Sequence, residues 1–228
     1  ILTGRRKEKL RILKDRICSE TNCNVHLLNF DIRSLKETKN AINSLSDNWQ
    51  NINILINNAG LAVGLNTFQE GIIDDWERMI DTNVKGLLYI TRLVSPFMIK
   101  KQSGHIINIS SIAGRETYPL GNVYCATKHA VQSLSAGMRL DLLEHGIKVS
   151  SLCPGAVNTE FSNVRFKGDS EKADKVYDGF SPLMAQDIAE TILFMITRPP
   201  HVNIDDLLIM PTAQGFSRAI HKQNDLKE

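Results

Sequence analysis

The sequence predicts an α/β fold built on one doubly wound parallel sheet. Short apolar runs, typical of buried strands, alternate along the chain with longer segments in which apolar residues recur at helical spacing. This alternation predicts parallel strands joined by right-handed helical crossovers, with helices on both faces of the sheet. The chain has 228 residues, of which 42% are hydrophobic, enough for one large domain with its own core. We therefore expect a single domain over residues 1–228.

Five strands are predicted from apolar runs that polar residues or glycine interrupt. They cover residues 25–30, 52–56, 105–109, 147–152 and 207–210. Each segment between them carries an apolar stripe at helical spacing. The stripes consist of Leu10, Leu13 and Ile17 in the first helix, Trp76, Ile80, Val84, Leu87 and Leu88 in a second, and Val131, Leu134 and Met138 in a third.

The longest segment without regular periodicity runs over residues 154–182, with one short helix expected over 171–178. A connection of that length inside a compact domain is usually functional, so we interpret it as a substrate lid. Residues 214–228 are polar, and we expect them to form a flexible tail.

Composition excludes several classes of function. The formal net charge is +2, which predicts no general attraction to nucleic acid or to anionic membranes. No apolar stretch approaches the ~18 residues of a membrane span, and no secretory signal is visible. The four cysteines are scattered, at spacings that fit neither a disulfide framework nor a zinc site; they are Cys18, Cys23, Cys125 and Cys153. We expect a reduced, cytoplasmic protein without a metal.

Polar or backbone-permissive residues follow four of the predicted strands. They are Asp31, the run Asn57-Asn58-Ala59-Gly60, the pair Ser110-Ser111 and the run Cys153-Pro154-Gly155. In doubly wound sheets, ligands bind beyond the carboxyl ends of the strands. A single such residue would only end a strand, but four groups at one edge favour a binding site.

Tyr124 and Lys128 are four residues apart, so in a helix both side chains leave the same face. A phenol titrates near ~10, and a fixed positive charge beside it lowers the pKa by roughly one to three units. We therefore expect Lys128 to convert Tyr124 into a usable acid–base group. The pattern Tyr-x-x-x-Lys is common by itself, and other motifs must make it specific.

Taken together, the motifs resemble those of the classical short-chain dehydrogenase/reductase family, in order and spacing over nearly the whole chain. They are Asn57-Asn58-Ala59-Gly60, Asn83 within Thr82-Asn83-Val84-Lys85-Gly86, Ser111, Tyr124 with Lys128, and Pro154-Gly155. The resemblance implies a Rossmann-like fold. A narrower resemblance, to the branch of NADP-dependent 3-hydroxy acid (serine and L-allo-threonine) dehydrogenases, rests on residues 159–168, on His201-Val202-Asn203-Ile204 and on Met210-Pro211.

The family begins with a strand and a Thr-Gly-x-x-x-Gly-x-Gly turn that holds the pyrophosphate of the cofactor. Here Ile1-Leu2-Thr3-Gly4 resembles the end of the family's second strand. The resemblance therefore predicts a sheet that lacks its first, central strand and the phosphate-binding turn. We expect the given sequence to omit an N-terminal piece.

The resemblance also assigns roles to four catalytic residues. Tyr124 would transfer the hydroxyl proton, while Lys128 would stabilise the phenolate and hold the cofactor ribose. Ser111 would donate a hydrogen bond to the substrate oxygen, and Asn83 would hold a water that is joined to Lys128. The alternatives are local: a strand-end hydroxyl for Ser111, and a side chain that bonds within its own helix for Asn83.

Arg5 and Arg6 follow Gly4, which ends the segment that resembles the family's second strand, where a dinucleotide fold places the adenosine ribose. No Asp or Glu occupies residues 3–7, so NADP is favoured over NAD. The alternative is a basic helix start, which the helix dipole disfavours. By resemblance, the remaining cofactor contacts would come from Asp31 and Ile32 at the adenine, Asn58, Ala59 and Gly60 at its ribose, Pro154, Gly155 and Val157 at the nicotinamide, and Thr159 at the carboxamide or a phosphate.

A hydroxy-acid substrate needs a partner for its carboxylate. Arg115 and Arg165 are both candidates for bidentate binding, and a solvent-facing arginine is the alternative for each. We favour Arg165, because a lid arginine can close on the acid together with Ser111 and Tyr124.

The substrates implied by the resemblance are serine, allo-threonine, other 3-hydroxy acids and malonic semialdehyde. Two alternatives stay open: a reductase of uncharged ketones, sugars or steroids, and a cofactor-binding scaffold without catalysis. The family is usually homotetrameric.

Overall fold

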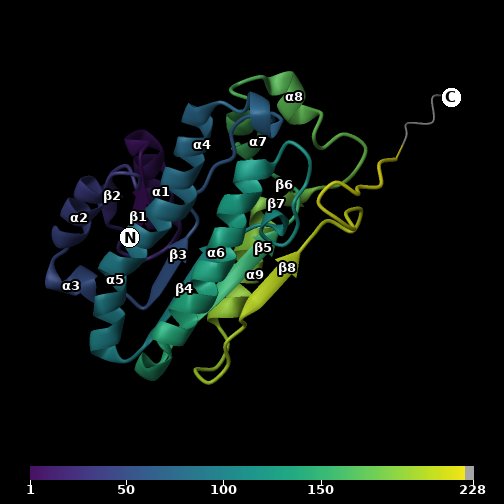
Figure 1. Ribbon diagram of the computed structural model, residues 1–228. Coiled ribbons are helices and arrows are strands. Elements are labelled where there is room, and N and C mark those ends of the chain that lie inside the picture. Colours follow the sequence, from purple (N-terminus) through teal and green to yellow (C-terminus); the bar gives the residue numbers. More distant parts are fainter. Residues whose placement is uncertain (224–228) are drawn as a thin grey trace.

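Parallel strands form the centre of the computed structural model, which describes residues 1–223, and helices pack on both faces of them (Figure 1). Four strands form the main sheet in the order β3-β4-β5-β8. Their bounds are Ile54–Asn57, Gly104–Ile109, Ile147–Pro154 and Asp206–Ile209. All three pairs in this sheet are parallel, so the predicted α/β fold with a Rossmann-like sheet is confirmed.

The remaining strands form two smaller parallel sheets. β1 (Leu2–Gly4) pairs with β2 (Leu27–Asn29), and β6 (Val157–Asn158) pairs with β7 (Leu183–Met184). Within residues 1–223 no ladder joins β1 to β3, and Ile54 and Ile56 of β3 are exposed. The sheet is thus interrupted where the family resemblance predicts a missing strand.

The longer helices cover the sheet from two sides. α4 (Ile73–Ile80), α5 (Leu87–Lys101) and α6 (Asn122–Asp141) lie on one face, and α9 (Ala185–Ile196) lies on the other (Figure 1). Beside β1 and β2 lie α1 (Lys7–Glu20), α2 (Leu35–Asn43) and α3 (Asp47–Gln50). None of the helices within residues 1–223 is both long and apolar enough to cross a membrane. In the same range, no three His, Cys, Asp or Glu residues form a metal-binding group.

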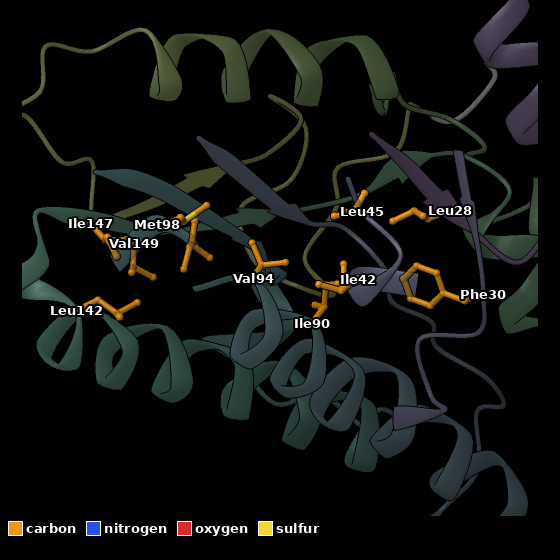
Figure 2. Close-up of a cluster of buried hydrophobic side chains, with 11 residues drawn as sticks. Leu28, Phe30, Ile42, Leu45, Ile90, Val94, Met98, Leu142, Ile147 and Val149 are labelled. Carbon is orange, nitrogen blue, oxygen red and sulfur yellow. The ribbon is translucent and has the colours of Figure 1, made fainter. Parts of the chain in front are cut away.

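Alternate side chains of β4 fill the two cores. Ile106 faces the cluster between the sheet and helices α5 and α6, whose neighbours Val94, Met98 and Val149 are drawn in Figure 2. Ile107 faces the opposite side, where it packs with Met195 of α9. Successive strand residues point to opposite faces, so burial of both isoleucines means that the sheet is covered on both sides.

The predicted apolar stripe of the second helix is wrong at two of its residues. Ile80 and Leu88 are 40% and 39% exposed, whereas Leu87 is buried as predicted and Met79, which was not predicted, is buried as well. Between α4 and α5 the backbone forms a π-helical turn, Asp81–Gly86, which changes the phase of the helix faces. The buried stripe also includes the polar residues Asp75, Thr82 and Asn83, which a search for apolar periodicity does not detect.

The segment 154–182, which the sequence predicts to be a lid, contains more helix than expected. It includes α7 (Phe161–Arg165), which was not predicted, and α8 (Ser170–Asp174), which starts and ends earlier than the expected helix over 171–178. The flexibility of the tail, residues 214–228, stays a prediction, and the part that the structure describes makes contacts with the rest of the chain. Gln214 is buried, and the backbone N–H of Gln223 donates to the carbonyl of Gly179. Residues 224–228 of the predicted tail lie outside the described range.

Buried His105 makes the stability of the fold depend on pH. Its Nε2 lies 2.8 Å from Ser150 Oγ, and burial, aided by the charge of Lys148, lowers its pKa to about 4. Between pH 6.5 and pH 4 the unfolded chain binds a proton at this residue that the folded chain does not. Acidification from pH 7.5 to pH 5 should therefore remove about 2 kcal/mol of stability through His105.

Urea unfolding of the wild-type protein and of His105→Gln at both pH values measures this effect. The variant should lose that part of the pH dependence, whatever its absolute stability. Equal pH dependence in the two proteins would contradict the assignment.

Candidate active site

Helix α6 places Tyr124 and Lys128 on one buried face, as the spacing predicted. Their exposed fractions are 8% and 5%, and Lys128 Nζ lies 6.0 Å from the centre of the Tyr124 ring. The ammonium donates a 2.9 Å hydrogen bond to the carbonyl of Ile109, the last residue of β4. The helix thus joins the phenol and the ammonium to the carboxyl end of the sheet.

The protonation of this pair differs from the prediction. Burial, followed by the nearby Tyr118, raises the pKa of Tyr124, and the hydrogen bond with Ser111 and the charge of Arg165 offset this only in part. Burial lowers the pKa of Lys128 to about 8. The predicted lowering of the phenol pKa by Lys128 is therefore wrong for this structure, because the cost of burying a phenolate dominates. At neutral pH the phenol is protonated and is a hydrogen-bond donor.

Ser111 makes a local hydrogen bond at the strand end and also lies at the site. It caps the short 3₁₀ helix Ile112–Gly114, where its hydroxyl accepts a hydrogen bond from the Ala113 N–H at 3.1 Å. The same hydroxyl donates to the carbonyl of Pro154 at 3.4 Å, and its presence lowers the pKa of the Tyr124 phenol in part. A serine at this strand end therefore joins the ends of β4 and β5 and acts on the phenol.

Asn83 lies in the π-helical turn and fixes the loop after β3. Its Nδ2 donates to the Leu61 carbonyl and its Oδ1 accepts from the Leu61 N–H, both at 2.8 Å. The Nδ2 also donates to Thr127 Oγ1 of α6 at 3.0 Å. The alternative of bonds within its own helix is thus not observed. A role in a water relay to Lys128 stays a prediction.

The loop after β3 approaches this pair closely. A Cβ added to Gly60 would lie 3.4 Å from both Asn83 Oδ1 and Lys128 Nζ. Asn58 and Ala59 belong to the same loop, and Asn57 anchors it through bonds to Thr91 and Asn108 at 2.9 and 2.8 Å. The three residues predicted to meet the ribose therefore come from a loop that passes directly beside Lys128.

The residues predicted for the adenosine side lie at the ends of β1 and β2. Arg5 Nη1 is 3.7 Å from Asp31 Oδ2, and the Arg33 side chain bonds the same carboxyl, which lowers the pKa of Asp31. Arg6 Nη1 pairs with Glu160 of the lid at 2.8 Å. Both arginine side chains are largely exposed. Their binding of the 2′-phosphate of NADP stays a prediction.

Ile32 is partly buried and packs against the main core, and its contact with the adenine stays a prediction. The predicted nicotinamide side follows β5, where the Gly155 N–H donates to the carbonyl of Ile209. Gln214 Oε1 accepts from the Ala156 N–H at 2.8 Å, and a Cβ at Gly155 would lie 2.2 Å from that oxygen. A side chain at position 155 would therefore displace the Gln214 amide from this hydrogen bond.

The remaining two residues of this group lie in the lid. Val157 belongs to β6, and Thr159 Oγ1 accepts from the Phe161 N–H at 3.3 Å. The structure thus assigns the Thr159 hydroxyl a bond to the local backbone, and its predicted bond to the cofactor stays a prediction.

The two candidate arginines for the substrate are clearly distinguished. Arg115 forms an ion pair with Asp206 of β8. Arg165 Cζ lies 5.5 Å from the ring centres of both Tyr118 and Tyr124, and its Nη2 donates to the Tyr118 hydroxyl at 2.9 Å. Arg165 Nε is buried and has no hydrogen-bond partner within residues 1–223. The structure therefore brings Arg165, and not Arg115, to the phenol.

Tyr118 is a residue of the site that the sequence analysis missed. It is buried beside Tyr124, and burial raises its pKa. Its one sequence signal is its place in the loop between Ser111 and Tyr124, in the turn Tyr118-Pro119-Leu120-Gly121.

A family model described as short chain dehydrogenase matches residues 1–170. The chain belongs to the short-chain dehydrogenase family. An NADP-dependent 3-hydroxy acid dehydrogenase of Escherichia coli strain K12 is 45% identical over 98% of this chain and 89% of its own length. An enzyme of the same name from Schizosaccharomyces pombe is 41% identical over 98% of the chain and 86% of its own length.

A solved structure of the family shows the same fold. A serine dehydrogenase in its closed form, in complex with NADP+, superimposes with a TM-score of 0.90 at 44% identity, over 97% of this chain and 88% of that chain. The predicted family and the predicted resemblance to the 3-hydroxy acid dehydrogenase branch are both confirmed.

Asn83→Ala should destabilise this short-chain dehydrogenase by about 2–3 kcal/mol, because the change leaves the buried N–H and carbonyl of Leu61 without partners. Urea unfolding at pH 7.5 measures this difference. The matched control is Asn40→Ala, on the exposed face of α2, which should shift stability by less than about 0.5 kcal/mol. Equal effects of the two changes would contradict the bracing role of Asn83.

Proposed function

We propose that this chain is an NADP-dependent oxidoreductase that transfers hydride between the cofactor and the carbon bearing the 3-hydroxyl or 3-oxo group of small acids. Serine, allo-threonine, other 3-hydroxy acids and malonic semialdehyde are the proposed substrates. The observation that carries this proposal is Arg165, whose guanidinium lies 5.5 Å from the Tyr124 ring and whose buried Nε has no partner in the described part of the chain. A carboxylate is the natural partner for such a donor.

The residues present fit a nicotinamide dinucleotide. Lys128 Nζ makes one hydrogen bond within residues 1–223, so the buried ammonium has further donors for a ribose. Gly60 and Gly155 let backbone approach closely at the two positions where a side chain would intrude. Arg5 and Arg6 supply positive charge at the adenosine end, as a 2′-phosphate requires. When bound, the nicotinamide supplies the hydride chemistry.

The protein supplies the proton and the hydrogen bonds. Burial keeps the Tyr124 phenol protonated, so in reduction it donates its proton to the substrate oxygen and becomes the phenolate. Oxidation is the reverse step and starts from the phenolate form, which accepts the proton of the substrate hydroxyl. Lys128, charged below about pH 8, stabilises that phenolate through its proximity. The Ser111 hydroxyl donates to the same substrate oxygen as charge develops on it. Asn83 holds the loop and helix that carry these groups.

Two relatives support the choice of cofactor and substrate. The Escherichia coli relative is an NADP-dependent 3-hydroxy acid dehydrogenase, and the solved structure is a serine dehydrogenase in complex with NADP+. The Arg115–Asp206 ion pair supports Arg165 as the arginine that meets the carboxylate.

We also propose that the enzyme is a cytoplasmic homotetramer. Its four cysteines are free thiols, two of them exposed, which fits a reducing compartment. Exposed apolar side chains on α4, α5 and α9, namely Ile80, Leu88, Leu193 and Phe194, offer surface for subunit contacts.

Tyr124→Phe should reduce kcat at least about 100-fold, because it removes the acid–base hydroxyl and keeps the ring. Steady-state kinetics with 3-hydroxypropanoate measures the loss, and NADPH fluorescence should show dinucleotide affinity within about threefold of wild type. The matched control is Tyr89→Phe on α5, which should keep normal turnover. Normal turnover of a Tyr124→Phe protein that binds dinucleotide would favour a different catalytic residue.

Arg165→Ala should raise the KM for 3-hydroxypropanoate by about tenfold or more, because a charged hydrogen bond to the carboxylate is lost. The methyl ester of the same acid has no carboxylate, and its KM should change by less than about twofold. Arg165→Lys should restore part of the affinity, since it keeps the charge but not the planar fork. An equal change for acid and ester would instead favour a reductase of uncharged substrates.

A further inference from the structure

The turn that follows Arg165 is tied to the rest of the protein at two points. The Gly64 N–H donates to the carbonyl of Arg165 at 3.1 Å. Two residues further on, Lys167 Nζ lies 2.7 Å from Asp75 Oδ2 of α4. Both contacts join the end of α7 to the region beneath the active site, where Gly64 and Asp75 line a cleft together with Tyr124.

Asp75 is a buried acid that needs a positive partner. Its residue surface is 3% exposed, and an isolated carboxylate is costly at such a position. Arg78 of the same helix approaches the other carboxyl oxygen only to 3.7 Å. No hydrogen bond of good geometry reaches Oδ2 within residues 1–223, so the ammonium of Lys167 is the close positive charge at this atom.

The backbone is shaped for this contact. Lys167 and Gly168 both have left-handed conformations, with φ of +55° and +91°, so the chain reverses directly after α7. Gly64 also has a positive φ of +73°, and a Cβ there would lie 3.0 Å from Asp75 Oδ2. A side chain at position 64 would therefore push on the carboxylate, and glycine leaves that space open.

We propose that Lys167 and Asp75 are a pair of positioning residues that hold the guanidinium of Arg165 against Tyr124 and thereby determine the affinity for the acid substrate. This inference rests on the proposed role of Arg165 in binding the carboxylate. Lys167 is two residues from Arg165, so its ion pair fixes the end of the helix that carries the arginine. Loss of the pair frees that helix end and lets the guanidinium leave the geometry that meets the carboxylate.

An ordinary lid ion pair provides the matched control. Lys172 lies 2.9 Å from Asp169 three residues earlier, and both side chains are substantially exposed. Such solvated pairs contribute little. Lys172→Met and Lys167→Met therefore remove the same charge from the same lid, but only the second removes the partner of a buried carboxylate.

The test is the kinetics of Lys167→Met, Lys167→Arg and Lys172→Met with 3-hydroxypropanoate, its methyl ester and L-serine. Methionine does not relieve the left-handed backbone, so Lys167→Met changes the charge alone. It should raise the KM for the acid about tenfold, with kcat within about twofold and the KM for the ester unchanged. Lys167→Arg should restore most of the affinity, and Lys172→Met should match wild type.

Asp75→Asn and the double variant Asp75→Asn with Lys167→Met complete a double-mutant cycle, which measures the coupling between the two side chains. The two changes should not be additive, because each removes the same contact. Thermal unfolding confirms that each variant is folded, and Lys167→Met alone remains a sufficient test if Asp75→Asn does not fold.

Three outcomes would overturn the inference. The first is an unchanged KM for the acid in Lys167→Met, and the second is an equal rise for acid and ester. The third is an effect confined to L-serine, which would make Asp75 a partner of the substrate amine. If Arg165→Ala raises the KM for the acid while Lys167→Met does not, only the positioning role fails. If Arg165→Ala leaves that KM unchanged, the proposed function fails as well.

Discussion

The burial of one ammonium group, that of Lys128, is the constraint around which the site is arranged. A charge in the interior is costly unless polar groups surround it, and its lowered pKa expresses that cost. The carbonyl of Ile109 at the end of β4 and the glycine loop after β3 meet this requirement. Helix α6 must therefore lie against the carboxyl ends of the strands, and this places the Tyr124 phenol there too.

Around this centre, ion pairs connect loops and outer helices to the rest of the chain. Arg115 joins the loop after β4 to Asp206 of β8, and Arg6 joins the first helix to Glu160 of the lid. Most of these pairs are partly exposed and are worth little individually. Asp75 is different because it is buried, so its partner has a larger effect. The side of the site that is proposed to bind substrate is thus held by contacts of unequal strength.

Much of this could be predicted from the sequence, because the relevant signals are local. Strand ends, the spacing of Tyr124 and Lys128, and the motifs around Asn83 and Ser111 are all readable in short windows. The predicted lowering of the Tyr124 pKa was wrong because it considered one neighbour and not the desolvation that the whole fold imposes. The buried side of α4 was misplaced because a π-helical turn shifts the periodicity, and Tyr118 was missed because its role depends on tertiary contact alone.

Gln214 connects the C-terminal segment of the chain to the loop after β5. Its Oε1 accepts from the Ala156 N–H at 2.8 Å, and a Cβ at Gly155 would lie 2.2 Å from that oxygen. A larger residue at position 155 would therefore displace the Gln214 amide from its hydrogen bond. The identities of residues 155 and 214 are thus coupled, although the two residues are far apart in the sequence.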